Sequence, residues 1–196
     1  NQIVFRSDYE LLTGITNLFI LIVSLYSFIR LKRINYNKYW LSFYMFLIVG
    51  SLLGFIIHSF NINDKIVNIL WIILLFIFIC IINSLLFSEY KYNKYIVFIS
   101  ILFYIFLVVE AIFNMDFIIT FVIYVCINFI FIIKSYIKNK RYYYLYSIII
   151  QIIGGLLLIS RNIKIWYLDH NGIYHLFMMI TVILFYISNK RYISEY

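Results

Sequence analysis

The stretch Ile66–Phe87, IVNILWIILLFIFICIINSLLF, decides the fold class of this chain. It contains no charged residue and no proline. About 20 apolar residues in a helix cover the roughly 30 Å of hydrocarbon at the centre of a bilayer. The stretch therefore predicts a transmembrane helix.

The same pattern recurs along the whole chain, with short polar breaks between the apolar runs. The other runs are Glu10–Ile29, Tyr39–Phe60, Tyr95–Phe113, Phe117–Ile137, Tyr143–Ser160 and Gly172–Ser188. The chain is 65% hydrophobic and 12% charged, whereas soluble domains are about half apolar and a quarter charged. These observations predict an all-α membrane protein, a single seven-helix transmembrane domain over residues 1–196. The break Asn114–Asp116 is either a tight turn or a kink in one long helix.

The cations predict the orientation of the bundle. If the spans alternate in direction, one face collects Arg30, Lys32, Arg33, Lys38, Lys91, Lys94, Lys134, Lys138, Lys140, Arg141, Lys190 and Arg191. Only Arg6, Lys65, Arg161 and Lys164 fall on the other face. Because cytoplasmic loops carry the excess of Lys and Arg, we expect the N-terminus outside and the C-terminus in the cytoplasm. The net charge of +8 is thus a topology signal, with no nucleic-acid partner expected, and a bacterial chain would lie in the plasma membrane.

Residues at the span boundaries indicate where helices begin and where the membrane surface lies. Asp64, Asp116 and Asn171 are acceptor side chains at positions that suit helix N-caps. Trp40 and Tyr142–Tyr144 lie at the cytoplasmic ends of their spans, where amphipathic rings form an interfacial belt.

Small and polar residues predict which helix faces pack inside the bundle. Gly50 and Gly54 recur with His58 at helical spacing in the second span, which lets another helix approach closely. Gly154-Gly155 suggests the same for the sixth span. Glu10, Thr13 and Asn17 form a polar stripe at the outer end of the first span.

The three histidines of the chain all fall at its outer end under this topology. His58 closes the second span, while His170 and His175 open the seventh within Asp169-His-Asn-Gly-Ile-Tyr-His175. Histidine near hydrocarbon is costly and tends to be functional when it faces the bundle interior. Three histidines with an open fourth position make a catalytic zinc site. Taken singly, each polar residue also suits a plainer role, a hydrogen bond between helices.

Two stretches, Gly50-Ser-Leu-Leu-Gly-Phe-Ile-Ile-His58 and Asp169–His175, resemble the superfamily of alkaline ceramidases and adiponectin/progestin receptors (CREST). The resemblance implies a zinc ion held by His58, His170 and His175, and a membrane lipid whose amide or ester bond is hydrolysed. Such a site would lie on the extracytoplasmic side.

The chain departs from that superfamily at three places. Gly54 stands where the superfamily has a serine, and His170 and His175 are spaced i, i+5 rather than i, i+4. His170 must therefore come from the loop before the helix or be absent from the site. The third span lacks the acid found in ceramidases, which leaves as candidate general bases Glu10, Glu110 and Asp169.

Three other classes of function remain open from the sequence. The main alternative is a non-enzymatic membrane sensor, subunit or scaffold whose polar residues only join helices. A small transporter fits less well, because there is no charged residue at the membrane midplane and no proline-broken helix. A b-type haem needs two histidines facing each other across the bundle. No particular protein partner is indicated.

Overall fold

The fold is seen in a computed structural model that describes residues 4–5, 8–113 and 117–193. The described residues form seven helices, each long and apolar enough to cross a membrane. They are α1 (Asp8–Arg33), α2 (Lys38–Ser59), α3 (Asp64–Glu89), α4 (Lys94–Ile112), α5 (Phe117–Lys138), α6 (Tyr142–Ser160) and α7 (His170–Ile193). The predicted all-α class and the seven spans are confirmed, and the chain is an integral membrane protein by these criteria. The break predicted at Asn114–Asp116 lies outside the described residues.

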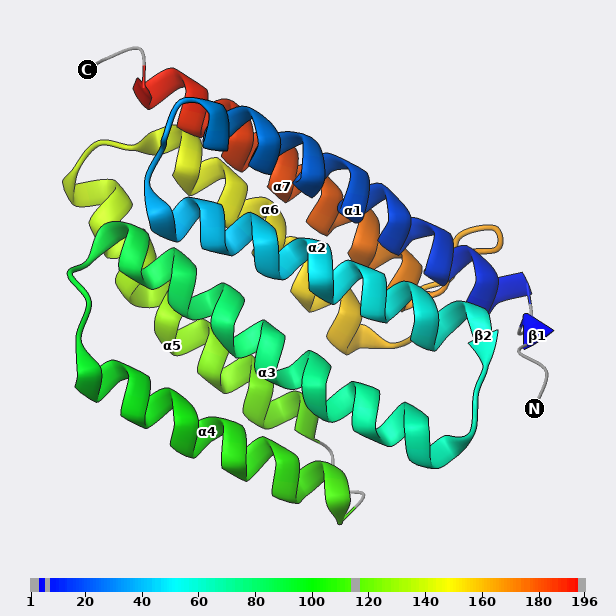
Figure 1. The fold of residues 1–196 in the computed structure, drawn as a ribbon. Helices are drawn as coiled ribbons and strands as arrows, with labels where there is room; N and C mark the ends of the chain where they lie inside the picture. Colours follow the sequence, from blue (N-terminus) through cyan, green and yellow to red (C-terminus); the bar gives the residue numbers. More distant parts are fainter. Residues whose placement is uncertain (1–3, 6–7, 114–116, 194–196) are drawn as a thin grey trace.

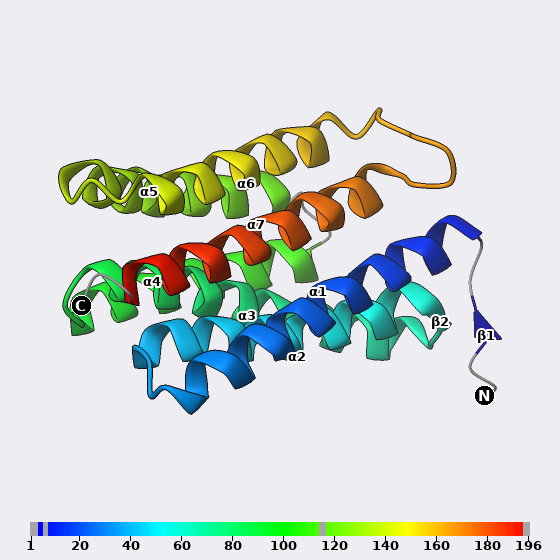
Figure 2. The ribbon, with the colours of Figure 1, turned by 90° about the horizontal axis from the view of Figure 1, so that it is seen from above.

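Consecutive helices run in opposite directions (Figure 1), and contacts join α1, α2, α3, α5, α6 and α7 into a closed ring. Helix α1 packs against both α2 and α7, α6 packs against α7, and α2 packs against α3. Helix α4 lies outside this ring against α3 and α5 and is the least buried of the seven. A short antiparallel pair, β1 (Val4–Phe5) with β2 (Phe60–Asn61), joins the N-terminal segment to the end of α2. Figure 2 shows this pair at the same end as the α6–α7 loop.

The two ends of the bundle differ in chemistry. We call "basic end" the end that holds Arg30, Lys32, Arg33, Lys38, Lys91, Lys94, Lys134, Lys138, Lys140, Arg141, Lys190 and Arg191. The opposite "histidine end" holds the three histidines, and Lys65, Arg161 and Lys164 are its cations among the described residues. The partition of charges expected from the sequence is therefore present in the fold.

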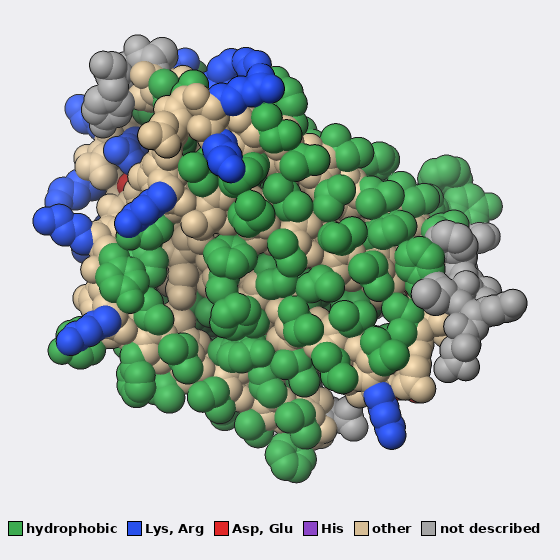
Figure 3. Space-filling model, in the orientation of Figure 1, with side chains coloured by type: hydrophobic (Ala, Val, Ile, Leu, Met, Phe, Trp, Pro, Cys, Tyr) green, Lys and Arg blue, Asp and Glu red, His purple; other side chains and the backbone are tan. Residues whose placement is uncertain are grey.

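Apolar side chains cover the surface between the two ends. Figure 3 shows a broad hydrophobic face, with most of its Lys and Arg gathered at one side. Ile22, Phe98, Ile130 and Leu156 are each about 60% exposed or more. Lipid is the solvent that such a surface requires, because apolar area exposed to water is unfavourable.

Every helix begins within two residues of its predicted span limit, and all but α1 and α7 also end within two. Helix α1 continues to Arg33, because a helix can extend past the hydrocarbon into the charged interface. The predicted N-cap Asp64 is wrong by one residue: Asn63 is the N-cap and its side chain accepts from the Lys65 amide. The predicted cap Asn171 is likewise wrong, since Asp169 accepts from the Gly172 amide at 2.9 Å. Asp116 lies outside the described residues.

The predicted aromatic belt is only partly at the surface. Tyr142 and Tyr143 are exposed, but Trp40 and Tyr144 are each 2% exposed. Their rings stack with centroids 5.3 Å apart and 14° between planes, and Tyr144 also stacks on Tyr136. These rings fill the interior of the basic end, where aromatic side chains contribute large buried areas.

Glycines allow close helix contacts towards the histidine end. A Cβ at Gly54 would lie 2.8 Å from the Asn17 Oδ1 atom, so α1 packs directly on the small-residue face of α2. A Cβ at Gly154 would lie 2.6 Å from Phe177 Cβ of α7, whereas at Gly155 it would meet nothing within 4 Å. The predicted close packing is therefore confirmed for Gly54 and Gly154 and is wrong for Gly155.

Candidate functional site at the histidine end

The first element of the site is a pair between α1 and α2. His58 Nδ1 lies 3.2 Å from Glu10 Oε2. A carboxylate only accepts hydrogen bonds, so the Nδ1 atom of His58 carries the proton. The His58 side chain is 15% exposed and the Glu10 side chain 39% exposed. The pair therefore lies at the rim of the bundle, with the imidazole on the inner side.

The second element joins α1 to α7 through His175. Its Nδ1 atom lies 2.9 Å from Thr16 Oγ1 and 3.3 Å from the Thr13 carbonyl oxygen. The Thr16 hydroxyl donates its single proton to that carbonyl at 2.7 Å. It therefore presents a lone pair to the imidazole, and Nδ1 of His175 is the donor.

The two imidazoles lie next to each other with the same proton arrangement. The ring centroids of His58 and His175 are 6.0 Å apart with 66° between planes. In the neutral form of an imidazole that is protonated on Nδ1, the lone pair lies on Nε2. Two imidazoles on one tetrahedral zinc ion would have ring centres about 5 Å apart. The observed separation is about 1 Å larger than this.

Asp169 belongs to the same cluster. Its Oδ1 atom accepts from the Thr13 hydroxyl at 3.1 Å and from the Gly172 amide at 2.9 Å. One carboxylate oxygen thus caps the N-terminus of α7 and links it to α1. Helix N-termini favour such a negative charge.

His170 is placed differently from the other two histidines. It is the first residue of α7 and not part of the preceding loop. Five residues along a helix correspond to a rotation of about 140° from one side chain to the next. His170 and His175 therefore project from different faces of α7. Within residues 8–113 and 117–193, no three His, Cys, Asp or Glu side chains are grouped so as to hold a metal ion.

Glu110, the third candidate base, lies in another pair. Its Oε1 atom accepts from the Thr120 hydroxyl at 2.9 Å, which joins α4 to α5. The cluster of Glu10, His58, His175 and Asp169 is built from α1, α2 and the start of α7 instead. Two of the three candidate bases, Glu10 and Asp169, are thus in the histidine cluster, and Glu110 is outside it.

Two neighbours of the histidines were not expected from the sequence. Thr16 contacts His175, and the ring of Trp71 on α3 lies perpendicular to that of His58 with centroids 6.3 Å apart. Thr16 lies three residues after Thr13, so it continues the polar stripe of the first span, and this spacing is a signal in the sequence. For Trp71 the sequence offers no such signal, because its contact depends on how α3 packs on α2.

The chain belongs to a family of unknown function (DUF6962), whose sequence model matches residues 12–194. The match includes all three histidines and Asp169, and it begins two residues after Glu10. No curated protein and no solved structure matches the chain.

Proposed function

We propose that this integral membrane protein binds a zinc ion at the histidine end, with His58 and His175 as ligands through Nε2. One observation carries the proposal: each Nδ1 atom is held by an oxygen acceptor, Glu10 for His58, and Thr13 with Thr16 for His175. Metal-binding histidines commonly donate the other ring N–H to a carboxylate or a backbone carbonyl, which fixes the tautomer and the ring orientation.

The described residues fit part of the site that the superfamily resemblance implies. The 6.0 Å between the ring centroids of His58 and His175 supports two of the three ligands, but among the described residues His170 forms no metal-holding group with them. A third ligand from this chain would have to come from the start of α7, where Asp169 already contacts α1 and His170 follows it.

A bound zinc ion would make water more acidic and polarise the carbonyl of a lipid amide or ester. Glu10, with 39% of its side chain exposed, would orient His58 and offer a proton acceptor near the rim. Asp169 would hold the start of α7 against α1. Lipid hydrolysis is the activity that these features and the resemblance favour.

Metal analysis of the detergent-purified protein tests this proposal. We expect about one zinc per chain, lost in His58→Ala and in His175→Ala and retained in His170→Ala. Zinc lost from all three variants would favour the three-histidine site instead. A wild-type protein that stays folded and binds no added zinc would contradict the proposal. For the catalytic part, zinc-dependent release of fatty acid from a lipid amide or ester is the measurement.

A second candidate function is that of a non-enzymatic sensor, subunit or scaffold. The same contacts favour it, because each of them also joins one helix to another. Glu10–His58 joins α1 to α2, and both Thr16–His175 and Thr13–Asp169 join α1 to α7. If the cluster only joins helices, His58→Ala and His175→Ala lower the thermal unfolding midpoint, and neither they nor the wild type binds zinc.

We further propose that the basic end faces the cytoplasm and the histidine end the opposite side. The distribution of Lys and Arg supports this orientation. Lys140→Cys and Lys65→Cys, each in a Cys80→Ser/Cys126→Ser background, test it by labelling of intact cells with an impermeant thiol reagent. We expect labelling at position 65 and protection at position 140. The reverse pattern would invert the topology.

A further inference from the structure

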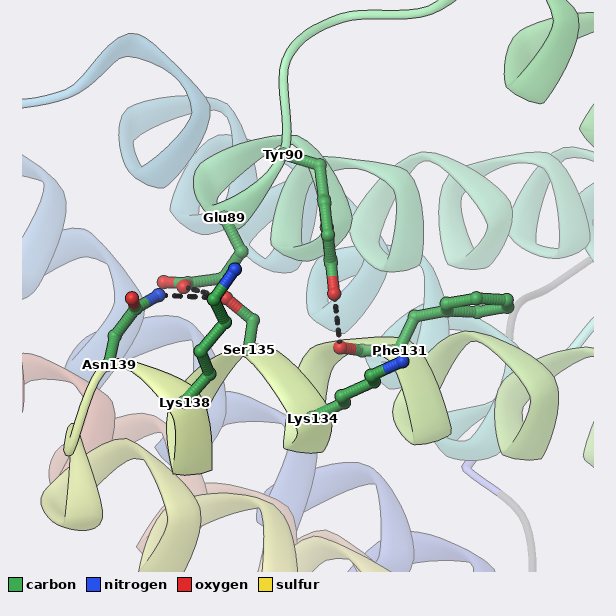
Figure 4. A pocket seen from close by; sticks show the side chains of 7 residues that line it. All are labelled: Glu89, Tyr90, Phe131, Lys134, Ser135, Lys138 and Asn139. Atoms are coloured by element: carbon green, nitrogen blue, oxygen red, sulfur yellow. Dashed lines mark hydrogen bonds between the residues drawn. The ribbon is translucent and has the colours of Figure 1, made fainter.

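A cavity of about 500 Å³ opens at the basic end, where the end of α3 meets the last turns of α5. Its walls include Glu89 and Tyr90 from α3 and its C-cap, and Lys134 and Lys138 from α5. In Figure 4, Lys138 rises from α5 towards Glu89, and Lys134 runs along α5 towards Phe131. The cavity is at the opposite end of the bundle from the histidines.

The charge of this cavity is positive despite the carboxylate in its wall. The Glu89 side chain is 1% exposed, its Oε1 atom lies 2.7 Å from Arg141 Nη1, and its Oε2 atom accepts from Ser135 at 2.7 Å. Both oxygens are thus already engaged, and the guanidinium balances the charge. Lys134 and Lys138 are exposed and, within the described part of the chain, neither has a carboxylate partner.

The two lysines act on the same side of α5. Residues four positions apart lie on one helix face, about 5–6 Å apart at Cβ. Two ammonium groups at this spacing can reach one phosphate group, which carries several acceptor oxygens. The cavity wall opposite them is fixed, because the Tyr90 hydroxyl donates to the Phe131 carbonyl oxygen at 2.7 Å and joins α3 to α5.

Apolar surface continues from the cavity along α5. Ile127, Ile130 and Phe131 are 45%, 65% and 53% exposed, and they lie on the side of Lys134 that leads into the hydrocarbon-facing part of the helix. A ligand that uses both surfaces carries an anionic head and a hydrocarbon chain. Basic pockets between transmembrane helices at the membrane surface suit the headgroups of anionic lipids.

We propose that this cavity binds the phosphate headgroup of an anionic phospholipid, with Lys134 and Lys138 as its cationic contacts and an acyl chain along the exposed face of α5. Inorganic phosphate shares the headgroup chemistry but lacks the chain, so it would use only the lysines.

Native mass spectrometry of the detergent-purified chain tests the proposal with phosphatidylglycerol as the probe and phosphatidylcholine as the neutral reference. We expect phosphatidylglycerol to bind more tightly, with affinity falling about 25-fold in Lys134→Gln/Lys138→Gln, since each lysine contributes roughly fivefold near anionic lipid. Lys134→Arg/Lys138→Arg should retain binding, which separates loss of charge from misfolding.

The matched control is Lys91→Gln/Lys94→Gln, which removes two cations from the same end outside the cavity. We expect less than about a twofold change there, because neither lysine lines the cavity and salt screens exposed charges that do not contact the headgroup. An equal loss in both double variants would overturn the proposal in favour of general surface attraction. Equal binding of the two lipids would overturn it as well. If inorganic phosphate bound as tightly as phosphatidylglycerol, the assignment of a lipid as the occupant of the cavity would be wrong.

Discussion

The two ends of the bundle each pair one carboxylate with a cationic or titratable group on another helix, yet the two pairs are built differently. At the basic end, the Glu89 side chain is 1% exposed and Arg141 and Ser135 engage both of its oxygens. At the histidine end, the Glu10 side chain is 39% exposed and contacts only the Nδ1 atom of the His58 ring. The first pair engages both oxygens of its carboxylate, whereas in the second only one ring nitrogen of His58 takes part.

The packing around the two pairs differs in the same sense. Stacked rings fill the basic end, among them Trp40, Tyr136 and Tyr144. All six glycines of the chain lie in the histidine-end half of their helices. Bulky rings form a tightly packed core at the basic end. Glycines at the other end let helix backbones approach closely enough for polar side chains of neighbouring helices to contact each other. The packing of the basic end therefore serves chiefly the stability of the fold, whereas the packing of the histidine end brings polar groups of different helices into contact.

The largest effect that we expect from testing this comparison is at Arg141. Arg141→Gln leaves the buried Glu89 carboxylate without its counter-charge, which should destabilise the protein by about 3 kcal/mol. Thermal or denaturant unfolding in detergent measures this loss. The neighbouring Lys140→Gln is the control and should change stability by less than about 0.5 kcal/mol. Equal effects of the two variants would show that Glu89 is not held in a low-dielectric interior.

The next largest effect concerns the glycine contacts. In Gly154→Ala the new methyl would lie 2.6 Å from Phe177 Cβ and push α6 away from α7. In Gly155→Ala it would meet no atom within 4 Å. We expect the first variant to be less stable than the second by about 2 kcal/mol, measured by the same unfolding assay. Equal stabilities of the two variants would contradict the close packing of α6 on α7 at Gly154.

A smaller effect is expected from the acceptor that holds His58. Glu10→Gln keeps an oxygen acceptor but removes its charge, so we expect zinc affinity to fall about tenfold. Competition with a chelator of known affinity measures it. Glu110→Gln is the control, because Glu110 bonds to Thr120 between α4 and α5. If both variants bind zinc like the wild type, Glu10 does not support a metal ligand.

The smallest expected effect concerns a polar cluster that only joins helices, and it measures how much such a cluster contributes to the free energy of unfolding. Asn83, Ser100 and Tyr124 form hydrogen bonds of 2.9–3.1 Å between α3, α4 and α5. Tyr124→Phe removes two of these bonds and should cost about 1 kcal/mol, since such bonds in membranes average about 0.6 kcal/mol each, while the exposed Tyr146→Phe should cost nothing measurable in the same unfolding assay. A loss of several kcal/mol at Tyr124 would mean that polar clusters in this bundle contribute more than helix joining explains.

The part of the site that could be predicted from the sequence is the part that topology alone fixes. His58 and His175 lie at the same end because their spans run in opposite directions, and Glu10 and Thr13 begin the adjacent first span. Thr16, whose hydroxyl contacts His175, was not predicted from the sequence. The i, i+5 spacing did indicate that His170 and His175 do not share a helix face, but it left open that α7 begins at His170 itself.

The sequence by itself determined the seven helices, their alternation and the sorting of cations to one end. Each of these depends on the apolar length or the charge of one segment and on its transfer between water and lipid, and not on which helix lies beside it. Only the tertiary structure decided which ring nitrogen meets an oxygen, which carboxylate is buried, and which of two adjacent glycines touches another helix. Those outcomes depend on the rotation of each helix about its axis and on its neighbours. Several residues of similar polarity fit each contact equally well until the helices have packed.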